Sequence, residues 1–287
     1  MIKKILILGS SGTLGKVLFK TLSNKYEVYH NGIRKRKVNI LNKNKLAKFL
    51  TMTNPDLIIN SAAAINIDYC EKNKNFTKRI NVDAIKNIFL IKSKYNLSFK
   101  FIQISTDQMY NRKNKLPSSE SVKPLIYNEY TRQKVRGEKI CLKQNSIILR
   151  TNFISYKKKN FFYWIVNAAK SKKKIFLFKD IFFNPLNALT LAKTISKIIY
   201  KLNNREIYGI YNLGTKDYIS KSDFCEYIIK KLKLDSCDYN IVLSDKYFKT
   251  KRPKNMKMNT KKFQKQFRIK LPLIKNEINK CLLEINA

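Results

Sequence analysis

The 287-residue sequence predicts an α/β fold, with helices on both faces of a doubly wound parallel sheet. In residues 1–150, short apolar runs that fit buried strands alternate with segments of helical periodicity. A glycine-rich turn, "GSSGTLG", separates the first of these runs from the first expected helix. A hydrophobic content of 44% is enough for a large core. A smaller C-terminal α+β domain is expected to complete the chain.

The expected elements of the first half follow one another in strict alternation. Apolar runs predict strands at residues 3–8, 26–30, 56–64, 99–106 and 145–152. Helices are predicted at residues 16–25, 42–54 and 76–95. The third helix carries an apolar stripe at Ile80, Ile85, Ile88 and Phe89, which would pack on the sheet. Such alternation is typical of a parallel sheet that is buried on both faces.

The alternation weakens after Arg150. Residues 156–180 are aromatic and basic and are predicted to be mostly helical, and residues 189–202 form a clear amphipathic helix. Residues 209–214 predict a short strand, and a helix over 220–234 has Ser220 and Ser222 as candidate N-caps.

No linker rich in Pro, Gly or Ser separates the two halves, so two interwoven domains are expected. Residues 1–150 with about 186–205 would bind a dinucleotide, and residues 151–185 with 206–287 would bind the substrate.

The net charge of +41 is spread through the chain. Because the basic runs are short and no block stands apart, we attribute the charge to compositional bias rather than to nucleic-acid binding. Five scattered cysteines without a C-x-x-C pair predict a cytoplasmic protein. A single histidine, His30, argues against a histidine metal site or a Ser-His-Asp triad. No apolar run is long enough to predict a membrane span, and Ile5–Leu8 is too short for a signal peptide.

The glycine turn predicts a Rossmann-type dinucleotide site. Gly9, Gly12 and Gly15 form G-x-x-G-x-x-G between an expected strand and an expected helix. This spacing lets the backbone approach a pyrophosphate, which then sits at the positive end of the helix. Because the glycines occur in this context, the pattern is more specific than a glycine triplet alone.

The end of the second strand indicates which dinucleotide binds. Proteins that bind NAD usually place a carboxylate there for the ribose 2′-hydroxyl, but Glu27 lies too early, inside the strand. Arg34 follows the strand and could face a 2′-phosphate, unless it is one more exposed basic residue. NADPH is therefore favoured, and NADH remains an alternative.

The stretch "YNEYTRQK" at residues 127–134 holds a candidate proton donor. Tyr130 and Lys134 are four residues apart and so share a helix face, whereas Tyr127 has no lysine at that spacing. A nearby ammonium lowers the pKa of a phenol, which otherwise is near 10. Thr106, with Ser105 at the end of a strand, supplies a hydroxyl that could polarise a carbonyl.

The order of these motifs resembles the extended short-chain dehydrogenase/reductases, and within them the dTDP-4-dehydrorhamnose reductase group of nucleotide-sugar enzymes. The resemblance covers nearly the whole chain. The segments that carry it are "ILILGSSGTLG", "NPDLIINSAAAINIDYCE", "INVDAIKNI", "ISTDQMY", "YTRQK…GE", "ILRTNF", "YGIYNLG" and "KRPKNMKMNTKKF".

The resemblance implies roles for individual residues. Thr106, Tyr130 and Lys134 would be catalytic, with Asn81 in support. The implied cofactor contacts, with Arg34 added from the residues themselves, are Gly9, Gly12, Thr13, Leu14, Gly15, Arg34, Asn39, Ala62, Ala63 and Lys134. The implied substrate contacts are Asp107, Gln108, Phe153, Arg252 and Asn255.

The positions that depart from the family's pattern are mostly those expected to contact the substrate, whereas the catalytic residues match the pattern. Asn39 stands where the family usually has Asp, and Ala64 and Gln108 stand where it has aromatic residues, although Phe153 remains aromatic. The segment "DIFFNPL" keeps only Asp180 and Pro185 of a longer family motif. Acidic residues linked to metal-assisted dimerisation in some members are not recognisable, so no metal is expected and a homodimer is left open.

The resemblance therefore implies an NAD(P)H-dependent reductase of a nucleotide-linked 4-keto-6-deoxy sugar, in the synthesis of cell-surface polysaccharide precursors. A nucleotide-sugar epimerase or dehydratase that retains NAD is an alternative, because Asp107 follows Thr106. A non-catalytic NADP-binding regulatory subunit is a third, although such a subunit would not need the Tyr130–Lys134 pair. No nucleic-acid or membrane partner is expected.

Overall fold

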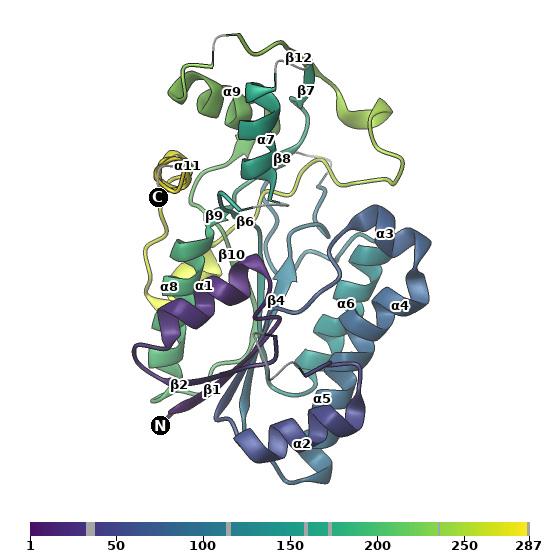
Figure 1. Ribbon diagram of the computed structural model, residues 1–287, viewed down its shortest axis with the longest axis vertical. Coiled ribbons are helices and arrows are strands. Elements are labelled where there is room, and N and C mark those ends of the chain that lie inside the picture. Colours follow the sequence, from purple (N-terminus) through teal and green to yellow (C-terminus); the bar gives the residue numbers. More distant parts are fainter. Residues whose placement is uncertain (33–37, 113–115, 158–159, 172–173, 235, 286–287) are drawn as a thin grey trace. The chain divides into compact units, whose positions relative to one another are not determined.

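A computed structural model of the chain describes residues 1–32, 38–112, 116–157, 160–171, 174–234 and 236–285 (Figure 1). Two compact units make up the chain, and each consists of three segments. The first unit contains Met1–Thr106, Ile126–Arg150 and Ala192–Tyr211. The second contains Asp107–Leu125, Thr151–Leu191 and Asn212–Ala287. That the first unit binds the cofactor and the second the substrate, with the boundaries expected above, stays a prediction.

A six-stranded sheet with the order β10-β5-β4-β3-β1-β2 forms the centre of the first unit. The strands are β1 (Lys4–Leu8), β2 (Glu27–His30), β3 (Leu57–Asn60), β4 (Lys100–Thr106), β5 (Ile147–Thr151) and β10 (Gly209–Leu213). The neighbours β1–β2, β1–β3 and β3–β4 pair in parallel. All of these strands lie within the predicted runs, so the predicted α/β class and parallel sheet are confirmed.

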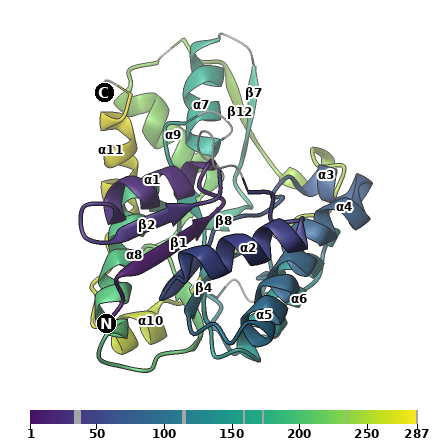
Figure 2. The ribbon, with the colours of Figure 1, turned by 60° about the horizontal axis from the view of Figure 1, so that its bottom comes forward.

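Helices cover both faces of this sheet, as the strand order requires. The helices are α1 (Thr13–Leu22), α2 (Lys43–Thr53), α3 (Ile67–Lys72), α4 (Lys74–Lys78), α5 (Ala84–Lys94), α6 (Glu129–Leu142) and α8 (Ala188–Leu202), with a π-helical turn η1 (Arg79–Asp83) between α4 and α5. The crossover from β1 to β2 and the crossover from β2 back to β3 run in opposite directions along the sheet, so right-handed connections put α1 and α2 on opposite faces. Figures 1 and 2 show α1 and α8 on one face, and α2, α5 and α6 on the other.

The strand order reverses between β1 and β3. The chain leaves β1 toward β2 and later returns to β3 on the other side of β1. In open α/β sheets, ligands bind outside the carboxyl ends of the strands at such a point. The segments after Leu8 and after Asn60 are therefore where a cofactor is expected to bind.

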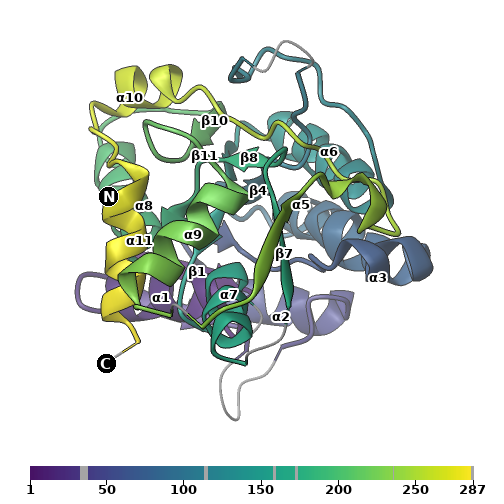
Figure 3. The ribbon, with the colours of Figure 1, turned by 90° about the horizontal axis from the view of Figure 1, so that it is seen from above.

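The second unit has a hydrophobic core of its own and three short two-stranded sheets. Its strands are β6 (Phe153–Ile154), β7 (Ile175–Phe178), β8 (Phe182–Phe183), β9 (Leu186–Asn187), β11 (Ile219–Ser220) and β12 (Tyr239–Val242). Its helices are α7 (Phe161–Lys170), α9 (Lys221–Lys231), α10 (Lys261–Phe267) and α11 (Ile274–Leu283), with a 3₁₀ turn η2 (Ser244–Lys246). Figure 3 shows the strands β7 and β12 beside α7 and α9. Phe162, Phe224, Ile228 and Ile278 are fully buried in this core.

The prediction that residues 156–180 are mostly helical was wrong in its second half. The helix α7 ends at Lys170, and β7 follows and pairs in parallel with β12. In β7, Ile175 and Leu177 are buried and Phe176 is exposed, which is the two-residue period of a strand. The run is short, and its partner lies more than sixty residues away, so the apolar content alone could not separate strand from helix.

Of the two candidate N-caps for α9, Ser220 is the N-cap, because its side chain accepts a hydrogen bond from the Asp223 N–H, whereas Ser222 lies within the helix. Among the residues that the structure describes, no helix is long and apolar enough to cross a bilayer.

A buried ion pair joins α6 to β5 in the first unit. Arg150 Nη2 lies 2.6 Å from Glu138 Oε2, and the two side chains are 2% and 3% exposed. Arg150 Nε also donates to Glu138 Oε1 at 3.0 Å, and Ser105 Oγ donates to the same oxygen at 2.5 Å. The helix α6 is thereby attached to two strands of the sheet.

Replacing Arg150 with Met should leave the Glu138 carboxylate buried without its guanidinium partner, which typically costs about 3–5 kcal/mol. Urea unfolding measures this loss in the free energy of unfolding. The control is Lys78→Met, which removes an exposed pair with Asp83 (3.3 Å) and should cost only about 0–1 kcal/mol. Equal losses in the two variants would show that burial does not set the strength of the Arg150–Glu138 pair.

Candidate active site

The glycine turn lies directly against the segment that follows β3. Gly9 has φ of +80°, a conformation that favours glycine. A Cβ atom at Gly9 would lie 2.5 Å from Ala62 N, so the two backbones leave no room for a side chain. Asn31, just after β2, accepts a hydrogen bond from Gly9 N at 2.9 Å and holds the turn from its other side. The residues after β1 and β3 thus meet where the strand order reverses.

The start of α1 fits an anionic group. Gly12 is the N-cap and supplies no side-chain hydrogen bond, and the first turn, which begins with Thr13 and Leu14, contains no acidic residue. The first N–H groups of a helix have no partner within the helix, and its dipole is positive at this end. A pyrophosphate group would accept hydrogen bonds from these N–H groups, and its negative charge would be attracted by the dipole. The predicted cofactor residues Gly9, Gly12, Thr13, Leu14 and Gly15 therefore belong to one turn.

The N-cap of α6 places Tyr130 in the first turn of that helix. Asn128 accepts hydrogen bonds from Thr131 N and Thr131 Oγ1, both at 2.9 Å, and the helix begins at Glu129. Tyr127 consequently lies outside the helix. The Tyr130 side chain is 7% exposed and belongs to a small apolar cluster with Ile67, Cys70 and the half-buried Ala64.

Lys134 lies one turn further along α6, and its side chain reaches β4. Its Nζ donates a hydrogen bond to Ile104 O at 2.8 Å. Burial lowers the pKa of the Lys134 ammonium from 10.5 to about 8, although the charges of Glu138 and Cys141 oppose this shift. Near neutral pH the group is therefore still largely protonated. Thr106, the last residue of β4, is two residues beyond Ile104 and is 5% exposed.

These contacts bring most of the predicted residues of the first unit together. The Gly9 turn touches Ala62, Ala64 packs beside Tyr130, and Lys134 is bonded to β4 near Thr106. Asn39 does not take part in these contacts. It is exposed, and its Oδ1 accepts a hydrogen bond from Leu41 N. Arg34 lies outside the described residues.

The predicted substrate residues all belong to the second unit. Asp107 is 1% exposed and accepts a hydrogen bond from Asn152 Nδ2 at 2.9 Å. Gln108 Nε2 donates to Met256 Sδ at 3.0 Å. Phe153 is half-buried in β6. Asn255 donates through Nδ2 to the carbonyls of Arg112 and Leu116, so its amide already holds a loop of the protein.

Arg252 lines an aromatic pocket of about 200 Å³ in the second unit. The other lining residues are Phe161, Trp164, Phe176, Leu177, Phe178, Lys221, Cys225 and Phe248. Arg252 Cζ lies 4.4 Å from the centre of the Phe248 ring, and Lys221 Nζ lies 4.4 Å from that of Phe161. Burial is the main cause that lowers the pKa of the Lys221 ammonium. This pocket combines flat apolar walls with two cationic side chains.

Lys221 and the aromatic walls of this pocket were not predicted from the sequence. Their only signal was the density of aromatic residues between 161 and 178. Within the described ranges, no group of three or more His, Cys, Asp or Glu side chains is arranged to hold a metal ion.

A parallel sheet with a glycine turn at its reversal point, and a Tyr–x–x–x–Lys helix beside the segment that follows β3, define the class of extended short-chain dehydrogenase/reductases. Residues 3–287 match the model of one family in this class, described as the RmlD substrate binding domain. The chain belongs to that family, and the resemblance predicted from its motifs is confirmed.

Individual relatives agree with this assignment. The chain is 27% identical over 239 residues to the dTDP-4-dehydrorhamnose reductase of Escherichia coli (strain K12), with 79% of each chain covered. It is 25% identical over 254 residues to the spore coat polysaccharide biosynthesis protein SpsK of Bacillus subtilis (strain 168), with 87% of each covered. The crystal structure of dTDP-4-dehydrorhamnose reductase from Bacillus anthracis in complex with NADP has a TM-score of 0.87 and 22% identity, covering 99% of this chain and 100% of that one.

Replacing Gly9 with Ala should weaken NADPH binding by about tenfold or more, because the methyl group would push the turn away from Ala62 and strain the backbone. Fluorescence titration with NADPH measures the change. The control is Gly209→Ala in β10, where φ is +110° but nothing lies within 4 Å of the added carbon. That variant carries the same kind of strain and should bind NADPH normally. Unchanged affinity in Gly9→Ala would contradict the placement of the cofactor.

Proposed function

We propose that this chain is an NADPH-dependent reductase of a nucleotide-linked 4-keto-6-deoxy sugar, and that it acts in the synthesis of cell-surface polysaccharide precursors. One observation carries the proposal: Tyr130 and Lys134 lie on one side of α6, Tyr130 beside the segment after β3 and Lys134 bonded to β4. The names of the relatives, a dTDP-4-dehydrorhamnose reductase and a polysaccharide biosynthesis protein, support the substrate class.

Three residues of the first unit, Thr106, Tyr130 and Lys134, each have a role in the proposed reduction. The bound dinucleotide supplies the hydride that reduces the carbonyl carbon. Tyr130 donates its phenolic proton to the carbonyl oxygen, and the Lys134 ammonium makes that phenol more acidic. Thr106 donates a hydrogen bond to the same oxygen as negative charge develops on it. An ammonium has three N–H donors, so Lys134 can bond Ile104 O and still hold a ribose hydroxyl.

The cofactor pyrophosphate would bind at the glycine turn. The start of α1, which has no side-chain cap, supports this placement. Ala62 and Ala63 would lie beside the nicotinamide ribose, and Asn39 near the adenine. NADPH is preferred to NADH because Arg34, rather than a carboxylate, follows β2. The complex of the Bacillus anthracis relative with NADP is in keeping with this preference.

The aromatic pocket of the second unit is suited to the nucleotide part of the substrate. A flat base can pack against Phe176 or Phe178, and Arg252 and Lys221 can neutralise a diphosphate. Asp107, Gln108 and Phe153 would contact the sugar. Asn255 would act on substrate through the loop that its amide holds.

A cytoplasmic location and a homodimer belong to the same proposal. All five cysteines are free thiols, which is typical of a reducing compartment.

Replacing Tyr130 with Phe should lower kcat for NADPH oxidation by roughly 10²–10⁴-fold, because the proton donor is lost. NADPH affinity should stay within about threefold, since the ring still packs against Ala64. A panel of nucleotide-linked 4-keto sugars is the assay, and Tyr127→Phe is the matched control, with near-normal kcat expected. Full activity in Tyr130→Phe would contradict the mechanism. Bound NAD⁺ with turnover but no net NADPH consumption would instead favour an epimerase or dehydratase.

The rate of reduction should fall as pH rises through about 8, because Lys134 then loses the proton that keeps the Tyr130 phenol acidic. The measurement is kcat/KM for the keto sugar at saturating NADPH across the pH range. In Lys134→Met the rate should be low and show no inflection near this pH. A wild-type rate that stays flat to about pH 9.5 would contradict this role of the ammonium.

A further inference from the structure

We propose that Gln133 is a positioning residue for the reaction: its buried amide ties the helix that carries Tyr130 and Lys134 to the segment bordering the glycine turn. This inference rests on the proposed function. It concerns a side chain that lies between the two reactive residues in the sequence and that none of the proposed chemical steps uses.

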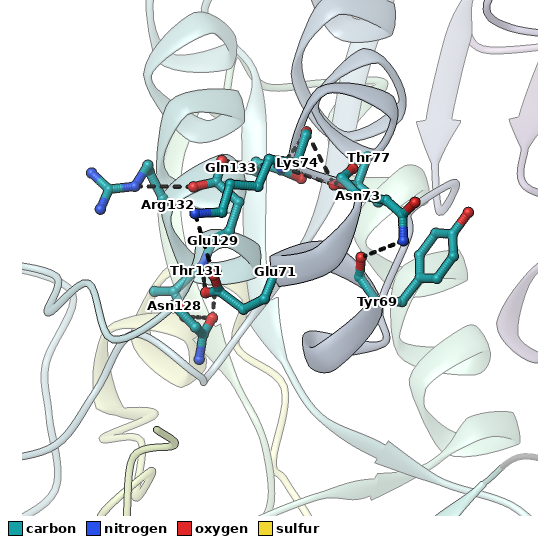
Figure 4. Close-up of polar contacts among 10 residues, drawn as sticks. All are labelled: Tyr69, Glu71, Asn73, Lys74, Thr77, Asn128, Glu129, Thr131, Arg132 and Gln133. Carbon is teal, nitrogen blue, oxygen red and sulfur yellow. Dashed lines mark hydrogen bonds and ion pairs between the residues drawn. The ribbon is translucent and has the colours of Figure 1, made fainter. Parts of the chain in front are cut away.

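The Gln133 amide is fully buried, and each of its polar atoms is hydrogen-bonded. Figure 4 shows the contacts of its Nε2 atom with Lys74, Thr77 and Glu129. Its Nε2 donates to Lys74 O at 3.1 Å and to Thr77 Oγ1 at 3.0 Å, and it also lies 3.1 Å from Glu129 Oε1. Its Oε1 accepts a hydrogen bond from Asn81 Nδ2 at 2.9 Å. One side chain of α6 thus joins α4 and the π-helical turn η1.

Asn81 extends this connection to the cofactor side of the site. Its Nδ2 donates to Ala64 O at 3.0 Å, and its Oδ1 accepts from Ala64 N at 2.9 Å. Ala64 directly follows Ala62 and Ala63 and packs beside Tyr130. The contacts therefore form a closed circuit from Tyr130 along α6 to Gln133, through Asn81 to Ala64, and back to Tyr130.

The backbone packing around this circuit is tight. A Cβ atom at Gly137, one turn beyond Gln133, would lie 3.0 Å from Asn81 O and 3.0 Å from Ile85 Cδ1. The helix α6 therefore lies directly against η1, with no side chain between them. A small change in how Gln133 is bonded would shift both the phenol and the segment beside the glycine turn.

A second attachment holds the first turn of α6. Glu71 Oε1 accepts a hydrogen bond from Glu129 N at 2.6 Å (Figure 4). Glu71 also lies 3.7 Å from Lys74 Nζ, and Glu129 pairs with Arg132 at 3.2 Å. These ion pairs are partly exposed and contribute little. The buried Gln133 amide is the stronger constraint on the position of Tyr130 relative to Ala64.

The test is Gln133→Met, which keeps the length of the side chain and removes its hydrogen bonds. Misplacing the phenol and the hydride donor should lower kcat about 10- to 100-fold while NADPH affinity changes by less than about threefold. Rates are expressed per NADPH-binding site, so loss of folded protein does not count as loss of activity. The deuterium isotope effect on kcat with NADPH labelled at the transferred hydrogen should increase, because hydride transfer becomes slower relative to product release.

A matched control separates positioning from stability. Thr53→Val removes a buried hydrogen bond, Thr53 Oγ1 to Phe49 O at 2.8 Å, in α2. It should lower the melting temperature but leave kcat and the isotope effect unchanged. Thr77→Val removes one acceptor of Gln133 and should reproduce both kinetic changes at smaller size, which keeps the test available if Gln133→Met does not fold.

The activity of the wild-type protein separates a failure of the proposed function from a failure of the positioning role of Gln133. If the wild-type protein oxidises no NADPH with any keto sugar, the proposed function fails and this inference falls with it. If the wild-type protein is active, and both Gln133→Met and Thr77→Val keep its kcat and isotope effect, only the positioning role of Gln133 is overturned.

Discussion

The hydrogen bond from Lys134 Nζ to Ile104 O fixes the geometry on which the site depends. It brings an ammonium group into a buried position at the carboxyl end of β4, one helical turn beyond Tyr130. Burial makes that charge costly, as the lowered pKa of Lys134 shows, and the carbonyl and the nearby Glu138 carboxylate offset part of the cost. A buried ammonium acts more strongly on a neighbouring phenol than one in water, because the surroundings screen it less. The proposed acidity of Tyr130 follows from this one placement.

The fold supplies the rest of the site through topology. The reversal of strand order between β1 and β3 sets the Gly9 turn against Ala62, and α6 packs beside the segment that follows. The Arg150–Glu138 pair and the Gln133 amide attach α6 to the sheet and to η1 through buried polar contacts. Such contacts are costly unless every partner is satisfied, so they favour one arrangement of the helix over nearby alternatives. A rigid helix suits a mechanism that depends on the position of one proton.

Much of this arrangement could be predicted from local patterns. The Tyr130–Lys134 spacing, the glycine turn and the strand that ends at Thr106 are each visible within a few residues of sequence. The π-helical turn that contains Asn81 was not visible, because residues 79–83 differ from an ordinary helix only in how the backbone is bonded. The role of Gln133 was not visible either, since its partners come from α4 and η1. The β7–β12 pair and the pocket around Lys221 likewise depend on contacts between distant segments.

A crystal structure of the chain with bound NADP⁺ tests the central claim most directly. We expect the pyrophosphate at the start of α1, the nicotinamide between Ala62 and Tyr130, and a ribose hydroxyl within hydrogen-bond reach of Lys134 Nζ. A nicotinamide ring bound away from Tyr130, with Lys134 Nζ out of reach of the ribose, would contradict the account.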